Sequence, residues 1–257
     1  MTESSADELR IERKGPALWL TLDRPHRRNA LTLSLANALA DAISNPGQDV
    51  RVIVLTGEPP AFCSGGDLAD LKAIAEQGPL AVTEVVYECY HRLVSSVGAA
   101  SVPVIAAVNG PAVGGGFDLA LWCDLRVATT DATFVSSWIN LGLVPGMGGA
   151  HLLTRIIGAT RATEVVLLGR PVDAQVALAW GLVNAVVPPH QLESYIGGLV
   201  ETLASLSPLA VQRSKAALRR ARDAGIAEEL VTLGAVQATL STEFDFQAVE
   251  DRLRTKS

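Results

Sequence analysis

Two glycine-rich segments hold the residues of this chain best suited to chemistry. They are Ala61–Asp67 (AFCSGGD) and Asn109–Asp124 (NGPAVGGGFDLALWCD), and each separates an apolar, strand-like run from a run with helical spacing. Because glycine has no Cβ, its backbone can turn sharply and approach a ligand closely. A turn that opens a helix also leaves N–H groups unpaired at the positive end of the helix dipole. Two such turns facing one another would bind a small anionic oxygen, so the pattern predicts a site for carbonyl chemistry.

These segments also allow other interpretations, some of them purely structural. A single glycine-rich turn often serves only the tight packing of a strand on a helix. Neither segment matches the dinucleotide-binding G-x-G-x-x-G pattern or the phosphate-binding G-x-x-x-x-G-K-[ST] pattern. Cys63 has no neighbouring base in sequence, which predicts a small buried hydrophobe rather than a nucleophile. Asp67 stands where a helix would begin, which predicts a helix cap.

The elements around the two turns alternate between strand and helix patterns. This alternation predicts an α/β fold with mostly parallel strands, and the short β-branched runs predict strands buried on both faces. From Ala174 onward the pattern is almost entirely helical, with helix starts at Pro188–Pro189 and Pro208 and one strand-like run at Leu182–Val187. Strands are expected at Ala17–Asp23, Val50–Leu55, Val102–Val108 and Leu125–Ala128, helices at Leu31–Ile43, Leu68–Glu76 and Thr83–Ser96, and a glycine-rich loop at Leu141–Gly149.

Composition limits the class of protein. A chain of 257 residues, 49% of them hydrophobic, suits one large domain or one domain with a small appendage. A net charge of −6 argues against a nucleic-acid partner, which requires a basic face. The three cysteines form no CxxC, and no His, Cys and carboxylate cluster has metal-ligand spacing, so we expect a reduced compartment and no metal. Without an evident signal peptide or membrane span, a soluble cytoplasmic protein is expected, with no membrane partner.

Further blocks accompany the two turns in a fixed order. They are RRNAL at 27–31, AFCSGGDL at 61–68, PVIAAVNGPAVGGGFDLALWCDLRVA at 103–128, LGLVPGMGG at 141–149, GLVNAVVP at 181–188 and SPLAVQRSKAALRRA at 207–221. In these blocks the chain resembles the enoyl-CoA hydratase/isomerase (crotonase) family, over nearly its whole length.

The resemblance implies an architecture and a ligand. The expected fold is a crotonase-like spiral of ββα units over residues 1–195, followed by a C-terminal helical region, residues 196–257, that trimerises. The expected assembly is a homotrimer or a dimer of trimers. The implied ligand is an acyl-CoA thioester, and no separate cofactor is expected because coenzyme A is part of the substrate.

The resemblance also implies roles for individual residues. The backbone N–H groups of Gly66 and Gly115 would hold the thioester oxygen as it becomes an enolate-like anion. The stretch Gly66–Ala69 would lie along the CoA arm, and Arg27 and Arg28 are candidates for its phosphates, although paired arginines at a turn are often only a solvated corner. The predicted substrate-binding residues are Arg27, Arg28, Ser64, Gly66, Asp67, Leu68, Ala69 and Gly115.

The chain departs from the family pattern at the acid/base positions. Family hydratases have two glutamates, and these positions hold Asp118 and Trp138 here. Asp118 keeps a carboxylate, whereas the indole N–H of Trp138 can only donate a hydrogen bond. The aspartate that other members use for dehalogenation or dienoyl isomerisation falls at Gly146. The predicted catalytic residues are Gly66, Gly115, Asp118 and Trp138.

Several other polar side chains could reach the same pocket. Ser136, Ser137 and Asn140 flank Trp138, while Glu84, Glu88 and His91 lie on the helix that lines the acyl site in the family. A lone histidine such as His91 is more often a surface or packing residue.

The function implied is that of an acyl-CoA thioester enzyme working through an enolate-like intermediate, with enoyl-CoA hydration as the family's commonest activity. Double-bond migration, decarboxylation and C–C cleavage stay open. A different class also stays open: an acyl-CoA-binding protein on the same scaffold with little activity, because tryptophan replaces the second glutamate.

Overall fold

The computed structural model describes residues 8–223, and the chain divides into two compact units, Met1–Ser205 and Leu206–Ser257. The strands of the first unit are β1 (Leu9–Lys14), β2 (Ala17–Leu22), β3 (Val52–Gly57), β4 (Val104–Val108), β5 (Ala112–Val113), β6 (Leu125–Thr129), β7 (Thr133–Val135), β8 (Val172–Asp173) and β9 (Ala185–Val187). Its helices are α1 (Leu33–Ser44), α2 (Leu68–Ala75), α3 (Pro79–Ala81), α4 (Glu88–Ala99), α5 (Gly115–Trp122), α6 (Gly149–Leu168), α7 (Ala174–Ala179) and α8 (Leu192–Ala204). Shorter turns are the 3-10 turns η2 (Pro25–Arg27), η4 (Ser137–Leu141) and η5 (Pro189–Gln191) and the π-helical turn η3 (Val82–Tyr87).

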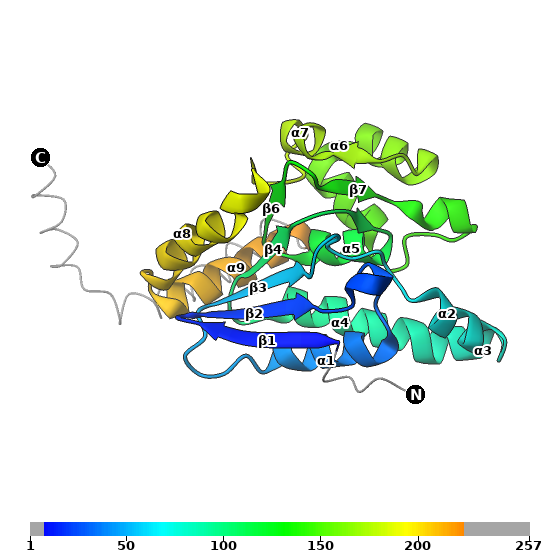
Figure 1. The fold of residues 1–257 in the computed structure, drawn as a ribbon, viewed down its shortest axis with the longest axis horizontal. Helices are drawn as coiled ribbons and strands as arrows, with labels where there is room; N and C mark the ends of the chain where they lie inside the picture. The colour runs from blue at the N-terminus through cyan, green and yellow to red at the C-terminus, as the bar shows by residue number, and fades with distance from the viewer. Residues whose placement is uncertain (1–7, 224–257) are drawn as a thin grey trace, which may run out of the picture. The chain divides into compact units, whose positions relative to one another are not determined.

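A large sheet forms the centre of this unit, with strand order β1-β2-β3-β4-β6-β9. Only β1 runs antiparallel to its neighbour, and every other pair in this sheet is parallel (Figure 1). The side chains of β3 alternate between two apolar clusters, Ile53 and Leu55 in one and Val52 and Val54 in the other. The predicted α/β fold with mostly parallel, doubly buried strands is therefore confirmed.

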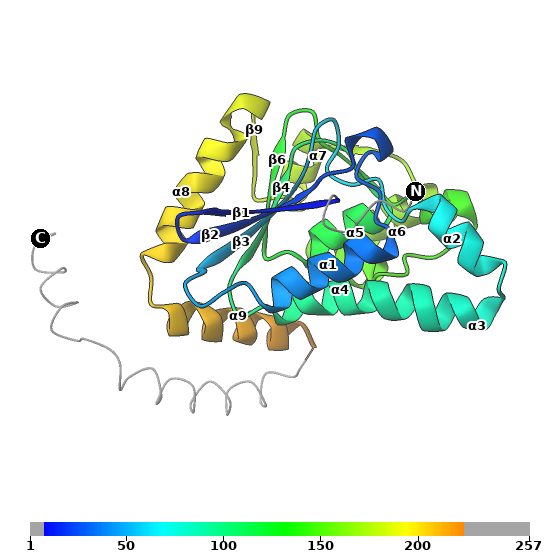
Figure 2. The ribbon, with the colours of Figure 1, turned by 60° about the horizontal axis from the view of Figure 1, so that its bottom comes forward.

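The two clusters lie on opposite faces of the large sheet. One contains the buried sides of α1 and α4, which pack along each other, and the other contains Leu192, Ile196 and Val200 of α8 (Figure 2). The side chains at these helix positions repeat every three or four residues, which places them on one face of the helix. The predicted helix Thr83–Ser96 is present as the turn η3 followed by α4.

The first helix begins later than the sequence pattern predicts. Leu31, where the apolar pattern starts, pairs instead with the first glycine turn: its N–H donates to Gly65 O at 2.7 Å and its carbonyl accepts from Asp67 N at 2.8 Å. Thr32 then caps α1, because its hydroxyl accepts from Leu35 N at 3.0 Å. The carbonyl of Leu31 accepts from Asp67 N, and Leu35 N donates to the Thr32 hydroxyl, so the helical hydrogen bond from residue 35 to residue 31 does not form.

A second sheet of three strands, with order β5-β7-β8, lies beside the two turns. The chain passes from β4 to β5 and then into α5, and from β6 to β7 and then on to α6, so each repeat contributes one strand to each sheet before its helix. This is the ββα repeat that the resemblance implies. The sequence pattern did not predict β1, β5, β7 or β8, because three of them have at most three residues and β1 is an exposed edge strand.

The C-terminal elements start where proline predicts. Pro189 opens η5 ahead of α8, and Pro208 opens α9 (Pro208–Asp223) in the second unit. The strand-like run Leu182–Val187 contains β9. The predicted trimerisation region 196–257 extends past the described residues and stays a prediction. Among the described helices, none has the length and apolar character needed to cross a bilayer.

Candidate active site

The two glycine turns lie against one another. Val113 N donates to Cys63 O at 2.9 Å, which joins the strand before the second turn to the start of the first. A Cβ added to Gly65 would lie 3.2 Å from Gly115 N, and a Cβ added to Gly115 would lie 3.7 Å from Gly66 N. Gly65 also has a φ of +94°, which side chains rarely adopt. The closest approach is at Gly116, where an added Cβ would lie 2.3 Å from Cys63 O, so this position permits no side chain without a shift of the turns.

The N–H groups of Gly66 and Gly115 are the free donors beside this contact. Within residues 8–223, the structure shows no hydrogen bond from either of them to another group of the protein. Gly115 is also the first residue of α5, so its N–H lies at the positive end of that helix. This arrangement can accept a small anionic oxygen.

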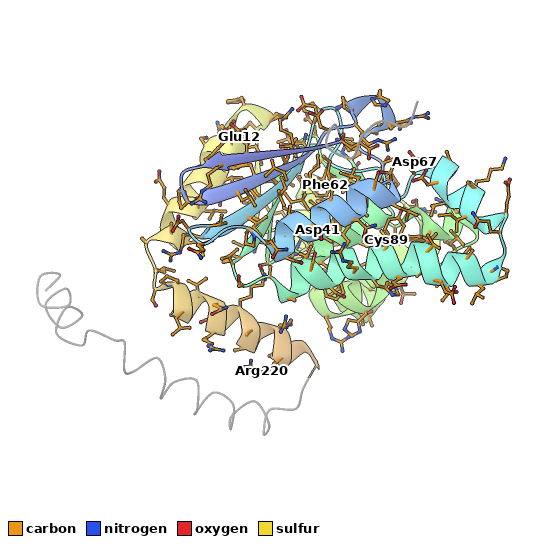
Figure 3. The ribbon with its side chains drawn as sticks, turned by 90° about the horizontal axis from the view of Figure 1, so that it is seen from below. Glu12, Asp41, Phe62, Asp67, Cys89 and Arg220 are labelled. Atoms are coloured by element: carbon orange, nitrogen blue, oxygen red, sulfur yellow. The ribbon has the colours of Figure 1, made fainter. Side chains whose placement is uncertain are left out.

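A buried ion cluster holds the first turn. Arg24 Nε lies 2.8 Å from a carboxylate oxygen of Glu8, and Arg24 Nη1 donates to Asp67 Oδ2 at 3.0 Å and to Ala30 O at 2.7 Å. Asp67 caps α2 by accepting from Ala69 N at 3.0 Å, as predicted, and lies at the start of that helix (Figure 3). Burial alone would raise the pKa of Asp67, but the hydrogen bonds from Arg24 and Ala69 outweigh it and hold the pKa below its usual value.

Asn29, the centre of the RRNAL block, connects the same turn to the end of β3. Its amide donates to Ala61 O at 2.7 Å and Glu58 O at 2.8 Å, and its side-chain oxygen accepts from Arg24 N at 3.0 Å. Its φ of +57° is one that asparagine tolerates better than most residues. The sequence analysis missed the structural roles of Asn29, Arg24 and Glu8. The one sequence feature that could have indicated these roles is an asparagine directly after a charged turn.

The predicted CoA-binding residues come together around the first turn. Ser64 N donates to Arg28 O at 3.0 Å and Ser64 Oγ to Arg27 O at 3.2 Å, so the two exposed arginines lie directly beside the SGGD turn. Leu68 and Ala69 open α2 with exposed side chains. The structure thus groups these residues, while their contact with CoA stays a prediction.

Asp118 lies one helical turn after Gly115, on the same face of α5. Its side chain is fully buried and faces the backbone N–H groups of Met147 and Gly149 and the indole N–H of Trp138. Burial raises its pKa to about 7, although these three donors act in the opposite direction. A Cβ on Gly149 would overlap Oδ1, so glycine at that position permits the close approach.

Trp138 stands at the second predicted acid/base position and has a nearly buried side chain. It is 8% exposed, and neither its Nε1 nor either Asp118 oxygen completes a hydrogen bond of normal geometry with the described residues. The nearby Ser136 is also buried, with no partner in the described structure for its hydroxyl.

The remaining candidates lie farther from this chemistry. Glu84 and Glu88 are exposed, and Asn140 is exposed beside Gly169. His91 Nε2 lies 3.0 Å from Gly146 O, an arrangement that suits a packing role. Tyr87 occupies the space that a side chain at position 146 would need.

Cys63 is fully buried, and burial raises the pKa of its thiol to about 12. Its prediction as a buried hydrophobe is confirmed. No cluster of three or more potential metal ligands occurs among the described residues.

Comparison with known proteins shows the family of the chain. The enoyl-CoA hydratase/isomerase family model matches residues 12–248. The chain belongs to the enoyl-CoA hydratase/isomerase family. Within this family it is 39% identical over 228 residues to the 2,3-dehydroadipyl-CoA hydratase of Escherichia coli, covering 86% of this chain and 87% of that protein.

Solved structures of the enoyl-CoA hydratase/isomerase family share the fold. An enoyl-CoA hydratase subunit I structure from Geobacillus kaustophilus superposes with a TM-score of 0.90 at 32% identity, covering 98% of this chain and 97% of that one. A Thermobifida fusca protein, whose structure was solved in complex with acetoacetyl-CoA, gives a TM-score of 0.84 at 31% identity, covering 93% and 97%.

Proposed function

We propose that this protein is an enzyme that acts on acyl-CoA thioesters, with Gly66 and Gly115 N–H binding the thioester oxygen and Asp118 transferring protons. One observation supports this most directly. Two N–H groups without protein acceptors in the described structure lie on turns that contact one another, and a buried carboxyl group with a pKa of about 7 lies one helical turn after the second. Family membership and the names of the relatives favour hydration of an enoyl-CoA.

Hydration can be written with Asp118 as the only acid/base. Its carboxylate takes a proton from water as the water oxygen bonds to C3 of the enoyl group. The electron pair of the double bond moves toward the thioester oxygen, and the two glycine N–H groups stabilise the resulting enolate. Asp118 then returns the proton to C2. A group with a pKa near the working pH populates both protonation states, which suits it to both steps.

The rest of the ligand would lie along the first turn. The Thermobifida fusca neighbour in complex with acetoacetyl-CoA supports an acyl-CoA ligand on this scaffold. Arg27 and Arg28, which are exposed beside Ser64, would meet CoA phosphates, and the exposed Leu68 and Ala69 would border its arm. We also infer a trimer or a dimer of trimers built through residues 196–257, which sedimentation equilibrium of the full chain would test.

Trp138 favours a second candidate, an acyl-CoA-binding protein with little turnover. The indole fills the position of the second glutamate and supplies no proton carrier. Binding of the thioester oxygen needs only the N–H groups of Gly66 and Gly115, which the enzyme and the binding protein would both use.

The decisive experiment compares turnover with binding. Crotonyl-CoA and a panel of longer enoyl-CoAs are followed by loss of the enoyl absorbance, and C2 hydrogen exchange of butyryl-CoA in D₂O by mass spectrometry. We expect turnover, at least about 100-fold lower in Asp118→Asn and unchanged in the control Asp131→Asn, whose side chain is exposed after β6. Tight binding of acyl-CoA with neither turnover nor exchange would contradict the enzyme and favour the binding protein.

A further inference from the structure

We propose that Arg24 and Tyr90 are positioning residues that aim the N–H of Gly66 at the thioester oxygen. Both act through Leu31, which is paired with the first glycine turn. The effect on the reaction rests on the proposed function, in which the Gly66 N–H binds that oxygen. The arrangement that aims the N–H rests on hydrogen bonds within the protein itself.

The two predicted N–H donors differ in what sets their direction. Gly115 is the first residue of α5, so the geometry of that helix directs its N–H. Gly66 lies before Asp67, the cap of α2, and is part of no helix. Within the described part of the chain, its one strand-like pairing is the isolated bridge to Leu31. The direction of the Gly66 N–H therefore depends on that bridge.

Two successive peptide groups connect Arg24 to this N–H. Arg24 Nη1 donates to Ala30 O at 2.7 Å. The same peptide group carries the N–H of Leu31, which donates to Gly65 O at 2.7 Å. The Gly65 carbonyl in turn shares its peptide group with the N–H of Gly66. Both peptide bonds are trans, and a planar trans peptide points its C=O and N–H in opposite directions, so the Gly66 N–H is directed away from Leu31.

Arg24 also ties together the two segments that the bridge joins. The nitrogen that donates to Ala30 O donates to Asp67 Oδ2 at 3.0 Å as well. Ala30 lies one residue before the bridge on one segment, and Asp67 lies one residue after it on the other. The guanidinium is buried, and its planar fork offers several N–H donors in fixed directions. It therefore holds the two segments at a fixed spacing.

Tyr90 of α4 supports the bridge at the next peptide group. Its hydroxyl donates to Leu31 O at 2.9 Å, and the same carbonyl accepts from Asp67 N at 2.8 Å. A Cβ added to Gly66 would lie 2.9 Å from the Tyr90 hydroxyl oxygen, so the hydroxyl also packs directly against the glycine. Tyr90 is 3% exposed, and α4 packs along α1. The packed interior thus fixes the hydroxyl that holds Leu31.

A purely structural role of these side chains makes a different prediction. Buried tyrosine hydroxyls usually find an acceptor, and a buried arginine needs its carboxylates, so both residues could serve stability alone. Their loss would then destabilise the fold and leave the bound thioester unchanged. A positioning role requires in addition that the thioester carbonyl become less polarised, because a misdirected N–H makes a weaker hydrogen bond.

The test measures the polarisation of the thioester carbonyl without turnover. Butyryl-CoA labelled with ¹³C at C1 is bound to the full chain, and infrared spectroscopy records its carbonyl stretching band. In the wild-type protein we expect the band below its frequency in free butyryl-CoA. Tyr90→Phe removes only the hydroxyl and should move the band back toward the free value. The control Tyr195→Phe removes the same group from an exposed position on α8 and should leave the band in place.

Arg24→Lys is the second variant, because lysine keeps the charge but lacks the planar fork that reaches Ala30 O and the carboxylates. The band should again move back, and the control Arg10→Lys, at a half-exposed arginine of β1, should not move it. Loss of a whole oxyanion donor costs about 100-fold or more in kcat, so a misdirected donor should cost about 10-fold with an enoyl-CoA substrate. KM should change little, because the hydrogen bond strengthens mainly in the transition state.

A band that keeps its wild-type frequency in folded Tyr90→Phe and Arg24→Lys would overturn the positioning role. A shift in only one variant would remove the other residue from the proposal. The two variants are independent, so if one does not fold, the other decides the result.

The outcome for the proposed function is separate. A wild-type protein that binds butyryl-CoA without lowering the band would contradict the proposed function. Amide hydrogen exchange of the ligand-free protein then tests the positioning by itself. Tyr90→Phe should speed exchange at Leu31 and Asp67, the two N–H donors of the bridge, and unchanged exchange at both would overturn the role of Tyr90.

Discussion

Two aspartates, each at the start of a helix after a glycine turn, have opposite electrostatic environments. Asp67 is paired with the guanidinium of Arg24, and its pKa lies below the usual value. Burial raises the pKa of Asp118 to about 7, and only uncharged N–H groups act against this shift. The side chain of Asp67 keeps 12% exposure, so its burial cost is smaller, and a full positive charge offsets it. Asp118 is fully buried, and uncharged donors offset its larger cost only in part. Asp67 therefore stays ionised and supports the structure, while Asp118 is poised to exchange a proton.

The two turns are also held by different forces. The first is held by charges and hydrogen bonds from Glu8, Arg24 and Asn29. The second is held by backbone hydrogen bonds, such as Gly114 N to Val135 O at 2.8 Å, and by close packing. Gly116 lies directly against the backbone of Cys63, and Met147 Sδ lies 2.9 Å from where a Cβ of Gly115 would be. Substitutions should therefore affect the first turn through electrostatics and the second through volume.

The largest effect is expected from Arg24→Met. It leaves the buried carboxylates of Glu8 and Asp67 without their cation, which should lower the free energy of unfolding by about 3–5 kcal/mol. The control Arg10→Met breaks ion pairs of a half-exposed arginine and should cost at most about 1 kcal/mol. Urea unfolding at neutral pH measures both. Equal losses of unfolding free energy in the two variants would show that burial of the ion cluster does not increase its contribution to stability.

The next effect concerns pH and Asp118. A folded-state pKa of about 7, above the ordinary 3.8, means that the folded protein binds the proton more tightly than the unfolded chain. The contribution of Asp118 to stability should therefore be greatest below pH 3.8 and be lost as pH rises toward 7, by up to about 4 kcal/mol. Asp118→Asn should lack this decline. Urea unfolding of both proteins at several pH values tests it, and parallel curves would contradict it.

A smaller effect is expected from Gly116→Ala in the second turn. The added Cβ would overlap the carbonyl oxygen of Cys63, and such overpacking should cost about 1–3 kcal/mol in unfolding free energy. Gly198→Ala, in open space on α8, is the matched control and should stabilise by about 0.5–1 kcal/mol. Thermal unfolding distinguishes the two. An unchanged unfolding free energy in Gly116→Ala would mean that the two turns can move apart without loss of stability.

The smallest effect is expected from Asp67→Asn. Asparagine can still cap α2 but accepts a weaker, uncharged hydrogen bond from Arg24, so we expect a loss of about 1 kcal/mol at neutral pH. Because the folded pKa of Asp67 lies below 3.8, its contribution is present above that pH and is lost as pH falls through the folded value. The difference between the two proteins should therefore vanish in acid. A difference that persists there would contradict the ion-pair explanation.

Local patterns predicted much of the fold and the site. The glycine turns, the cap at Asp67, the buried Cys63 and the central parallel strands follow from residues close together in sequence. Helix α1 begins later than predicted because Leu31 pairs with a segment far along the chain. The small sheet and the Glu8–Arg24–Asp67 cluster escaped prediction for the same reason, since they depend on contacts between distant segments.

By itself the sequence determined the family, because ordered motifs are a matter of residue type and spacing. It also predicted the two N–H donors and a tryptophan at a glutamate position. Only the tertiary structure decided how the two aspartates differ. Their pKa values depend on burial and on partners such as Arg24 and Trp138, which the fold brings together from separate elements. Whether a carboxyl group supports a turn or moves a proton is set by those neighbours, and neighbours in space are not neighbours in sequence.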